Sequence, residues 1–411
     1  MSAQTLPAPT PTVASRRGVG HGAGFWVVAA AFLVAMAFTV VPTPLWPLYQ
    51  REAGYSTLMV TVAYAAYAVG VTVSLFLAGH LSDRLGRRRV LLPAVLIEIV
   101  SGVLLLASTA FPAVLIGRAL SGVAVGMITA TATAALSELH AVARPAAGRS
   151  FAQLIATAAN MGGFAVGSLT SGLLAEWVGA PLRTPYVVYL VLLVAVAVAL
   201  LFIPETVTPP AVREPYRPQS VAVPPSARGR FATVAIGAFA AFAVLGLFAS
   251  VAPGFVGSTM GHPSRALAGL VAFLVFGSSV VSQLVVGRIS AGRQIMAGLS
   301  LLSLGLIAAT VAVWLPHLPL FLIGGAASGA GAGMLFKGSV GTVFAISEPA
   351  TRGEALAGLF LAGYLGLSIP ILGFGLATAV VSTQVALVGF AAGVVALAAV
   401  VAVRNARAAA A

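Results

Sequence analysis

The stretch GHLSDRLGRRRV, residues 79–90, is the most informative part of this chain. It joins two apolar segments, at roughly 53–78 and 91–110, and each is long enough to cross a lipid bilayer. The stretch itself holds one acid and four arginines. A short and strongly basic loop between two long apolar segments predicts a pair of membrane-spanning helices whose connection has a function.

The composition is typical of a polytopic membrane protein. Of 411 residues, 60% are hydrophobic and 8% are charged, and the mean hydropathy is +1.05. The net charge of +13 does not indicate nucleic-acid binding, because the arginines are spread over separate short loops. The chain has no cysteine, which excludes disulfides and thiolate metal sites.

The apolar segments predict an all-α polytopic membrane protein with twelve transmembrane helices. The first 24 residues are polar and proline-rich, and we expect them to be disordered. The apolar run after them is too long for a signal-peptide core, so we expect it to be the first helix. The twelve helices are expected at residues 25–48, 55–79, 90–109, 112–137, 150–176, 185–204, 230–256, 264–286, 294–314, 318–345, 353–377 and 382–403.

Basic residues set the expected orientation in the membrane. With the N-terminus in the cytoplasm, seventeen basic residues fall inside and three, Arg51, Arg183 and Arg265, fall outside. The positive-inside rule therefore predicts a multi-pass protein of the plasma (inner) membrane with both termini in the cytoplasm. The excess of arginine over lysine is a compositional hint of a bacterial source.

A proline- and arginine-rich stretch divides the chain into halves. Residues 205–229 are expected to form an extended cytoplasmic linker, because prolines interrupt any helix there. The linker would join six-helix bundles at 25–204 and 230–403, with a cytoplasmic tail at 404–411.

The two halves share a repeated segment. When the chain is shifted by 207 residues, LIGRALSGVAVGM (115–127) lies over LIGGAASGAGAGM (322–334), and eight of the thirteen positions are identical. The identical residues occur in the same order, and the shift is about half the length of the chain. This indicates that one half arose by duplication of the other.

The 79–90 stretch resembles the signature loop G-x-L-x-D-R-x-G-R-R/K of the major facilitator superfamily of secondary transporters. The matching residues are Gly79, Leu81, Asp83, Arg84, Gly86, Arg87 and Arg88. The resemblance implies two pseudo-symmetric six-helix bundles that rock about a central cavity lined by helices 1, 4, 7 and 10. It also implies that Asp83 faces the N-terminus of helix 11 and helps to close one conformation, while Arg84 or Arg87 pairs with Glu138. The alternative is a solvated loop that only fixes topology.

Two further segments resemble motifs of the drug–proton antiporter branch of this superfamily. Arg118-x-x-x-Gly122 matches the helix 4 motif R-x-x-x-G, in which the arginine tunes a nearby protonatable group. GGFAVGSLTSG (162–172) resembles the helix 5 motif G-x-x-x-G-P-x-x-G-G, but Ser168 replaces the proline and Ser171 replaces a glycine. For the first motif, the alternative is that Arg118 snorkels to the outer headgroups. For the second motif, the alternative is that the glycines only allow close packing of helices.

Glu98 is the only carboxylate well inside a predicted span. Because a buried acid is favoured in its protonated form, Glu98 can load and release a proton, and with Arg118 it is the predicted proton-coupling site. The alternative is a structural bridge from helix 3 to a neighbouring helix.

Polar and aromatic residues of several helices are predicted to line the substrate cavity. Lys337 is the only lysine of the chain, and it either faces the cavity or snorkels to the cytoplasm. Phe239, Phe242 and Phe248 would make the cavity largely apolar. The predicted lining is Met36, Thr39, Tyr64, Tyr67, Arg118, Gly122, Thr129, Asn160, Lys337 and Tyr364.

These features predict a secondary transporter that exports small lipophilic or drug-like molecules by proton antiport and alternating access. The alternatives are proton-coupled uptake or facilitated transport of a small metabolite or anion, and a membrane receptor or scaffold without transport. An enzyme is not expected, because the sequence has no His/acid metal cluster, nucleophile motif or phosphate-binding loop. We expect a monomer in a lipid bilayer with a small-molecule substrate, no cofactor and no nucleic-acid partner, driven by the proton gradient.

Overall fold

A computed structural model describes residues 19–79, 81–148, 150–207, 218–348 and 351–410, and within these ranges the regular structure is entirely helical. The first part of the chain forms α1 (His21–Thr39), η1 (Thr43–Leu45), α2 (Trp46–Ala53), α3 (Thr57–Ala78), α4 (Leu81–Leu85), α5 (Arg87–Ala107), α6 (Phe111–Ala143), α7 (Ser150–Trp177) and α8 (Thr184–Leu200). The second part forms η2 (Pro225–Ala227), α9 (Arg228–Ser250), α10 (Ala252–Ser258), α11 (Arg265–Val285), η3 (Val286–Arg288), α12 (Ala291–Trp314), α13 (Leu318–Ile346), α14 (Arg352–Ala377) and α15 (Thr383–Ala410).

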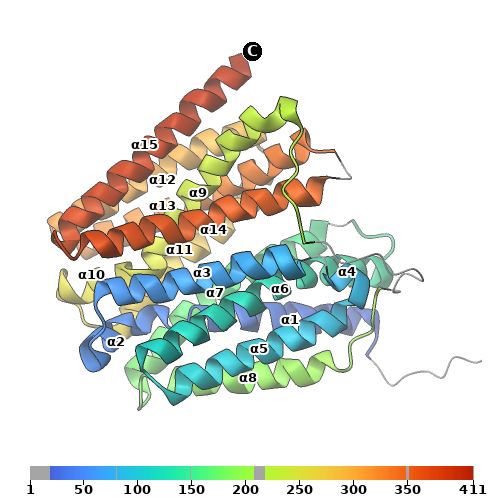
Figure 1. Cartoon of the computed structure of the whole chain (residues 1–411), viewed down its shortest axis with the longest axis horizontal. Coiled ribbons are helices and arrows are strands. Elements are labelled where there is room, and N and C mark those ends of the chain that lie inside the picture. The colour runs from blue at the N-terminus through green and yellow to red at the C-terminus, as the bar shows by residue number, and fades with distance from the viewer. Residues whose placement is uncertain (1–18, 80, 149, 208–217, 349–350, 411) are drawn as a thin grey trace, which may run out of the picture.

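Within the described ranges, ten helices are long and apolar enough to cross a membrane. Helix α8 is apolar but spans only 17 residues, and the 28 residues of α7 include many polar and small side chains. The helices of the first part of the chain, α1 to α8, pack on one another and form the first group. The helices of the second part, α9 to α15, form the second group in the same way, and the two groups lie side by side (Figure 1).

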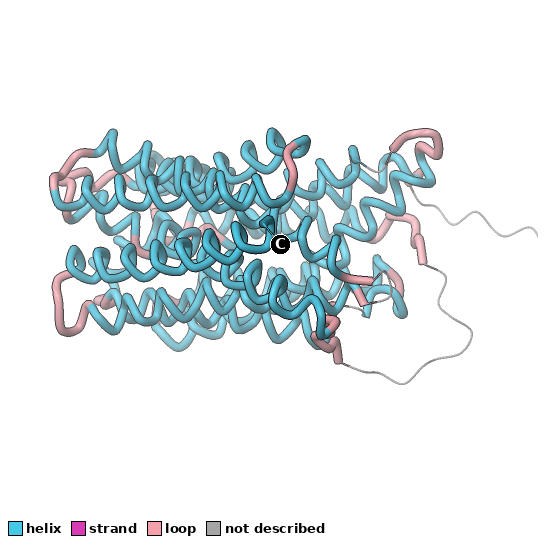
Figure 2. Tube along the Cα trace, turned by 90° about the horizontal axis from the view of Figure 1, so that it is seen from above, coloured by secondary structure: helices cyan, strands magenta, loops and turns pink. Residues whose placement is uncertain are grey.

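Loops gather at two ends of the molecule (Figure 2). We call one end the linker end, because it holds α4 and the segment that leads from α8 to α9. The opposite end is the far end, where α2 leads into α3 and α10 leads toward α11. These two names carry no statement about the sides of the membrane.

Proline interrupts the first helix of each group near the far end. Helix α1 ends at Thr39, because Pro42 and Pro44 cannot donate the backbone hydrogen bonds of a continuing helix. The chain then makes a 3-10 turn and resumes as α2. In the second group α9 ends at Ser250, and α10 begins beside Pro253. Both groups therefore bring a broken helix to the same end.

The repeated glycines of α6 and α13 make equivalent contacts. Gly122 of α6 lies against the backbone carbonyl of Tyr67 on α3, so a side chain at this position would overlap that carbonyl. Its repeat partner, Gly329 of α13, lies against the carbonyl of Val275 on α11 in the same way. The sequence repeat thus preserves a close helix pair in each group.

The helix boundaries differ from the predicted ones at both ends of the molecule. At the far end, the helix predicted at 25–48 stops at Thr39 and the helix predicted at 230–256 stops at Ser250. The other differences are mainly at the linker end. Helix α1 begins at His21, and α15 continues to Ala410 through residues predicted as a tail. The terminal stretch RNARAAA consists largely of strong helix formers, which explains the extension. Of the residues 1–24 predicted to be disordered, 1–18 lie outside the described residues, but 21–24 form the start of α1, so the prediction is wrong there. The linker residues 208–217 also lie outside the described residues.

Two helix pairs join the groups: α7 with α11, and α3 with α14. Gly172 of α7 and Gly269 of α11 face each other near the far end, and a Cβ atom on Gly269 would lie 2.5 Å from the carbonyl oxygen of Ser168. Gly375 of α14 packs on the side chain of Thr61 of α3. Both pairs therefore have a glycine contact at the far end.

Replacing Gly269 with alanine should force α11 away from α7, because the obstructing atom belongs to rigid backbone. We expect Gly269→Ala to destabilise the protein by about 1–3 kcal/mol in detergent unfolding measurements. The control is Gly277→Ala on the same helix, where nothing lies within 4 Å of the added Cβ. Equal unfolding temperatures for the two variants would contradict the tight crossing.

Candidate functional site

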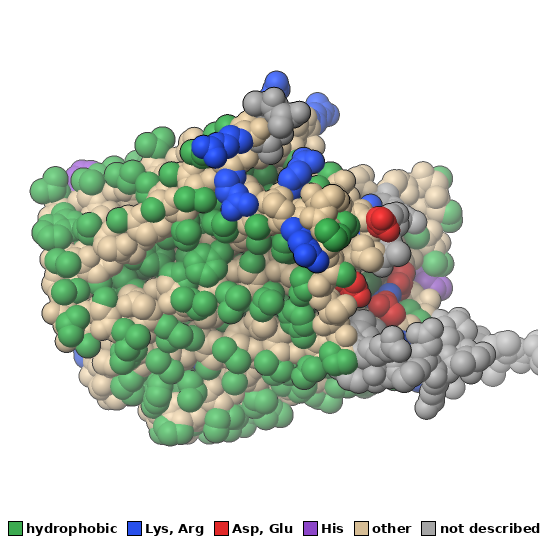
Figure 3. All heavy atoms as spheres, turned by 45° about the horizontal axis from the view of Figure 1, so that its top comes forward, with side chains coloured by type: hydrophobic (Ala, Val, Ile, Leu, Met, Phe, Trp, Pro, Cys, Tyr) green, Lys and Arg blue, Asp and Glu red, His purple; other side chains and the backbone are tan. Residues whose placement is uncertain are grey.

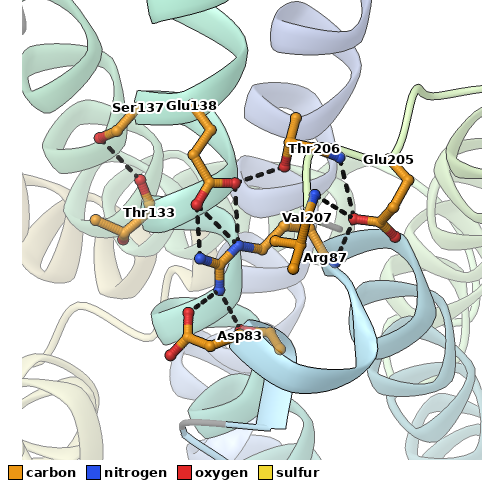
Figure 4. A network of polar contacts seen from close by, with 9 residues as sticks. Asp83, Arg87, Thr133, Ser137, Glu138, Glu205, Thr206 and Val207 are labelled. Carbon is orange, nitrogen blue, oxygen red and sulfur yellow. Dashed lines mark hydrogen bonds and ion pairs between the residues drawn. The ribbon is translucent and has the colours of Figure 1, made fainter. Parts of the chain in front are cut away.

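The 79–90 loop is held by a charged network at the linker end (Figure 4). The Arg87 guanidinium donates from Nη2 to Oε1 of Glu138 at 2.6 Å and from Nε to Oε2 at 3.1 Å. Its Nη1 lies 2.6 Å from Asp83 Oδ1 and donates to Ser82 at 2.7 Å. Only 9% of the Arg87 side chain is exposed. Arg87, rather than Arg84, is thus the loop arginine that binds Glu138.

Residues that follow α8 complete this network. Glu205 accepts hydrogen bonds from the backbone N–H groups of Arg87 and Arg88, at 2.7 and 3.2 Å, and so caps the N-terminus of α5. Thr206 donates to Glu138 at 2.5 Å. Gly86 adopts φ = +103°, a conformation that favours glycine, with the Glu205 carboxylate directly beside it. The loop is therefore tied to the start of the linker.

Asp83 is largely exposed, with 62% of its side chain accessible. Its ion pair is with Arg87, four residues along the same loop. The resemblance implied that Asp83 faces the N-terminus of the eleventh helix, here α14. A carboxylate that is mostly in solvent is not acting as a buried latch in this conformation.

The linker itself bridges the two groups at this end. The backbone N–H of Gln219 donates to the carbonyl of Phe76 on α3 at 2.9 Å, and the Ser220 hydroxyl donates to Glu354 on α14 at 2.8 Å. Val221 packs against Gly358 of α14. Figure 1 shows this yellow-green segment running between α14 and α3 before it enters α9. The linker thus joins α3 to α14 at the end where Asp83 of α4 would have to reach α14.

A cavity of about 40 Å³ lies between the two groups, near their middle. Aromatic and aliphatic side chains of both groups dominate its lining, with a small number of polar groups from the first group. Seven of the predicted lining residues contribute: Thr39, Tyr64, Tyr67, Arg118, Thr129, Asn160 and Tyr364. The lining also includes Val40, Val125, Met161, Phe164, Phe242, Leu245, Phe276, Phe360 and Leu367.

Glu98 and Arg118 lie close together but do not form an ion pair among the described contacts. Glu98 is fully buried on α5, and its Oε1 accepts from Ser121 at 2.9 Å and from the Thr39 hydroxyl at 3.3 Å. Arg118 donates from Nη1 to the backbone carbonyl of Thr39 at 2.6 Å. Thr39 therefore separates the carboxylate from the guanidinium. Glu98 Oε2 and Arg118 Nε have no hydrogen-bond partner among the described residues.

Two tyrosines cover the Arg118 guanidinium. Its central carbon lies 4.6 Å from the ring centre of Tyr67 and 5.7 Å from that of Tyr64. An aromatic face attracts a cation most strongly where water is excluded, so these rings stabilise a charge that is otherwise unpaired among the described residues. Both tyrosines also line the cavity, which places Arg118 at its wall.

Three predicted lining residues lie elsewhere. Met36 packs against Gly163 of α7, and Gly122 packs against α3. Lys337 donates from Nζ to the backbone carbonyl of Gln283, near the end of α11 at the linker end. A flexible lysine stem allows this reach toward the end of the helix, which corresponds to the snorkelling alternative. Of the predicted phenylalanines, Phe242 lines the cavity.

Polar contacts close the far end between the two groups. Glu176, near the end of α7, accepts at 2.7 Å from the backbone N–H of Arg265, the first residue of α11. Arg265 in turn donates to the carbonyl of Ala175 at 3.1 Å. A carboxylate at a helix N-terminus also interacts favourably with the helix dipole. This acid joins the groups at the end where the glycine crossings are tightest.

The described residues contain no group of three His, Asp or Glu side chains that could hold a metal ion. The polar groups that line the cavity are the Arg118 guanidinium, the Asn160 amide and the hydroxyls of threonines and tyrosines. The Glu98 carboxyl lies behind Thr39 and Ser121. A buried carboxyl with a free oxygen can exchange a proton, and an apolar aromatic cavity can bind an organic molecule.

The long apolar helices define a multi-pass, all-helical membrane protein with a cavity between its two groups. A family model described as Major Facilitator Superfamily matches residues 27–302, about two thirds of the chain. The chain belongs to the major facilitator superfamily. The signature loop at 79–90 lies within the matched region.

Relatives at the sequence level are similar over parts of their length. An uncharacterized MFS-type transporter of Mycobacterium tuberculosis is 31% identical over 220 residues, which cover 52% of this chain and 30% of that protein. The bacillibactin exporter of Bacillus subtilis is 33% identical over 85 residues, covering 20% of this chain and 21% of the exporter. The chain thus matches less than a third of the length of these two relatives.

Two solved structures share the fold. The human organic anion transporter MFSD10 superposes with a TM-score of 0.67 at 17% identity, covering 93% of this chain and 99% of the other. A point mutant of the nucleoside transporter NupG gives a TM-score of 0.73 at 13% identity, with the same coverage. At these identities the likeness concerns the fold alone.

Neutralising Glu138 should impair conformational switching more than substrate binding, because Arg87 would lose its bidentate partner far from the cavity. For Glu138→Gln we expect the transport rate to fall about tenfold while the substrate Kd changes less than about twofold. The control is Glu348→Gln, an exposed acid at the same end. A Kd that rises as much as the rate falls would contradict the separation of the loop from the cavity.

Neutralising Glu176 should loosen the far end, because the N-terminus of α11 loses a charged acceptor. The absence of native cysteine allows a single reporter, Ala272→Cys, at a buried position of α11. We expect Glu176→Gln to raise the rate of maleimide labelling at this cysteine by about fivefold or more. Glu52→Gln, which removes an exposed acid at the same end, is the control. Unchanged labelling in Glu176→Gln would show that Glu176 does not hold this end closed.

Proposed function

We propose that this protein is a proton-driven exporter of small lipophilic molecules, in the drug–proton antiporter branch of its superfamily. It would reside in the bacterial plasma membrane as a monomer of twelve spans, in two pseudo-symmetric bundles at 25–204 and 230–403. The equivalent packing of Gly122 and Gly329 supports the pseudo-symmetry. The proposal needs no enzymatic step and no cofactor, since the proton gradient supplies the energy.

The observation that carries the proposal is the environment of Glu98. Its carboxyl is fully buried, one oxygen is bound by hydroxyls, and the other has no partner among the described residues. An ionised carboxylate in this place is costly unless Arg118 moves toward it, so protonation and the position of Arg118 are coupled. Because Arg118 also lines the cavity, protonation of Glu98 can change the site that binds substrate.

The conformation fits one state of an alternating-access cycle. The far end is closed by Glu176 and by the glycine crossings, while Asp83 at the linker end is exposed. With the linker end and both termini in the cytoplasm, as the basic residues favour, this is an inward-facing state. The outward-facing state would then form when Asp83 engages α14 and Glu176 releases α11.

The lining of the cavity favours lipophilic substrates. Phe164 and Phe276, one from each group, lie with ring centres 5.3 Å apart, and Phe242 lies 5.6 Å from Tyr364. Aromatic side chains that can separate as the groups move suit flat or apolar molecules of varied shape. The partial match to a bacillibactin exporter agrees with outward transport.

A second candidate function is transport of an organic anion, by uptake or facilitated diffusion. The Arg118 guanidinium favours it, because this cation lies at the cavity wall with Nε unpaired among the described residues. The fold neighbours include an organic anion transporter and a nucleoside transporter. In this alternative the substrate would supply the negative charge that Arg118 lacks.

Proton flux in everted membrane vesicles tests the proposal. We expect an exported compound, added to energised vesicles, to dissipate the interior-acid gradient in the wild type but not in Glu98→Gln, which cannot exchange the proton. Ser101→Ala is the control, since Ser101 lies on the same helix and bonds the carbonyl of Gly117. It should retain the response.

The outcomes separate the candidate functions. If the gradient dissipates equally in Glu98→Gln, the protein is still an antiporter, but Glu98 is not the residue that couples proton flow to transport. Accumulation of an anionic substrate in whole cells, with no flux response in vesicles, would favour the second candidate.

A further inference from the structure

A cleft of about 500 Å³ opens at the linker end of the second group, away from the central cavity. Four helices form it: the starts of α9 and α12, the last turns of α13, and the end of α15. The residues that line it are Ser226, Gly229, Arg230, Thr233, Val234, Ala291, Gly292, Thr342, Ala345, Arg404, Asn405 and Arg407. No residue of the central cavity contributes, so this is a separate site.

Three arginines converge on the cleft without an opposing acid. Arg230 comes from α9, and Arg404 and Arg407 come from α15, while the lining contains no Asp or Glu. Within the part of the chain that the structure describes, Arg404 donates only to the carbonyl of Gly229, at 3.3 Å. Among the described residues, the side chains of Arg230 and Arg407 make no hydrogen bond or ion pair. Figure 3 shows basic side chains gathered at this part of the surface.

Neutral donors surround the arginines. Ala291 and Gly292 are the first two residues of α12, which is 24 residues long. The N-cap residue of this helix, Ser290, makes no capping hydrogen bond with its side chain. The first N–H groups of this helix therefore lie at the cleft and favour a negative charge. Three cations, free backbone donors and the absence of acids together match a phosphate-bearing anion.

The surroundings indicate that this anion is part of a lipid. Immediately before Arg404 on α15, Val400 and Val403 are 46% and 51% exposed. Phe344, beside the cleft on α13, is 45% exposed. In a membrane-spanning helix such side chains face acyl chains, so the arginines lie at the depth of the headgroups. A lipid whose headgroup binds in the cleft would lay its acyl chains along this apolar surface.

We propose that the cleft formed by α9, α12, α13 and α15 binds the phosphate headgroup of an acidic phospholipid. The cleft selects for negative charge through Arg230, Arg404 and Arg407. The lipid would join α15, the last helix, to the start of α9, which follows the linker. The inference does not depend on the substrate or the direction of transport.

Native mass spectrometry of the full chain with added phosphatidylglycerol tests the proposal, with phosphatidylcholine for comparison. We expect Arg404→Gln/Arg407→Gln to raise the Kd for phosphatidylglycerol about tenfold, because charge-assisted hydrogen bonds are lost. The matched control is Arg288→Gln/Arg293→Gln, which removes the same charge from the same end and the same group but outside the cleft. The control should change the Kd by less than about twofold.

Three results would overturn the proposal. An equal loss in both double variants would mean that general surface charge, rather than the cleft, attracts the lipid. Equal binding of phosphatidylcholine and phosphatidylglycerol would exclude selection for negative charge. Displacement of the lipid by inorganic phosphate, with direct phosphate binding that depends on Arg404 and Arg407, would assign the cleft to a free anion. Melting temperatures of both variants establish that they fold.

Discussion

A carboxyl group buried among the helices, with no cation in contact among the described residues, governs the arrangement of the central site. Glu98 is fully buried, and its hydrogen bonds come from Ser121 and Thr39. Neutral hydroxyls offset only part of the cost of an ionised carboxylate. The charge state of Glu98 must therefore change together with its surroundings. Thr39, the last residue of α1, connects Glu98 with Arg118. Its hydroxyl donates to Glu98, and its backbone carbonyl accepts from Arg118.

We propose that the two ends of the molecule use the same kind of interaction, each in one of two alternating conformations. At the far end, Glu176 of the first group accepts from the N-terminus of α11 of the second group. At the linker end, Asp83 of the first group is the proposed partner for the N-terminus of α14. Both contacts place a carboxylate on a helix dipole, and each is lost when the groups tilt away from one another at that end. The linker, bonded to Phe76 of α3 and Glu354 of α14, joins the two groups at the linker end.

Much of this arrangement was predictable from local sequence. The 79–90 stretch indicated the family, and apolar run length indicated most helices, because both signals depend on neighbouring residues. Glu205 and Thr206 were missed, since their role at the loop depends on where the chain returns after α8. Lys337 was assigned to the cavity from its depth, but the direction of a long side chain is set by nearby acceptors such as the Gln283 carbonyl. Phe276 and Phe360 gave no signal among the many apolar residues.

We propose that protonation of Glu98 changes which end of the molecule is closed. Spin labels in the cysteine-free chain can follow both ends, with one pair at Arg183 and His262 and another at Arg144 and Arg293. We expect acidification to change the two distances in opposite directions in the wild type, and to leave both unchanged in Glu98→Gln. Distances that change in the same direction, or an unaltered pH response in Glu98→Gln, would contradict the account.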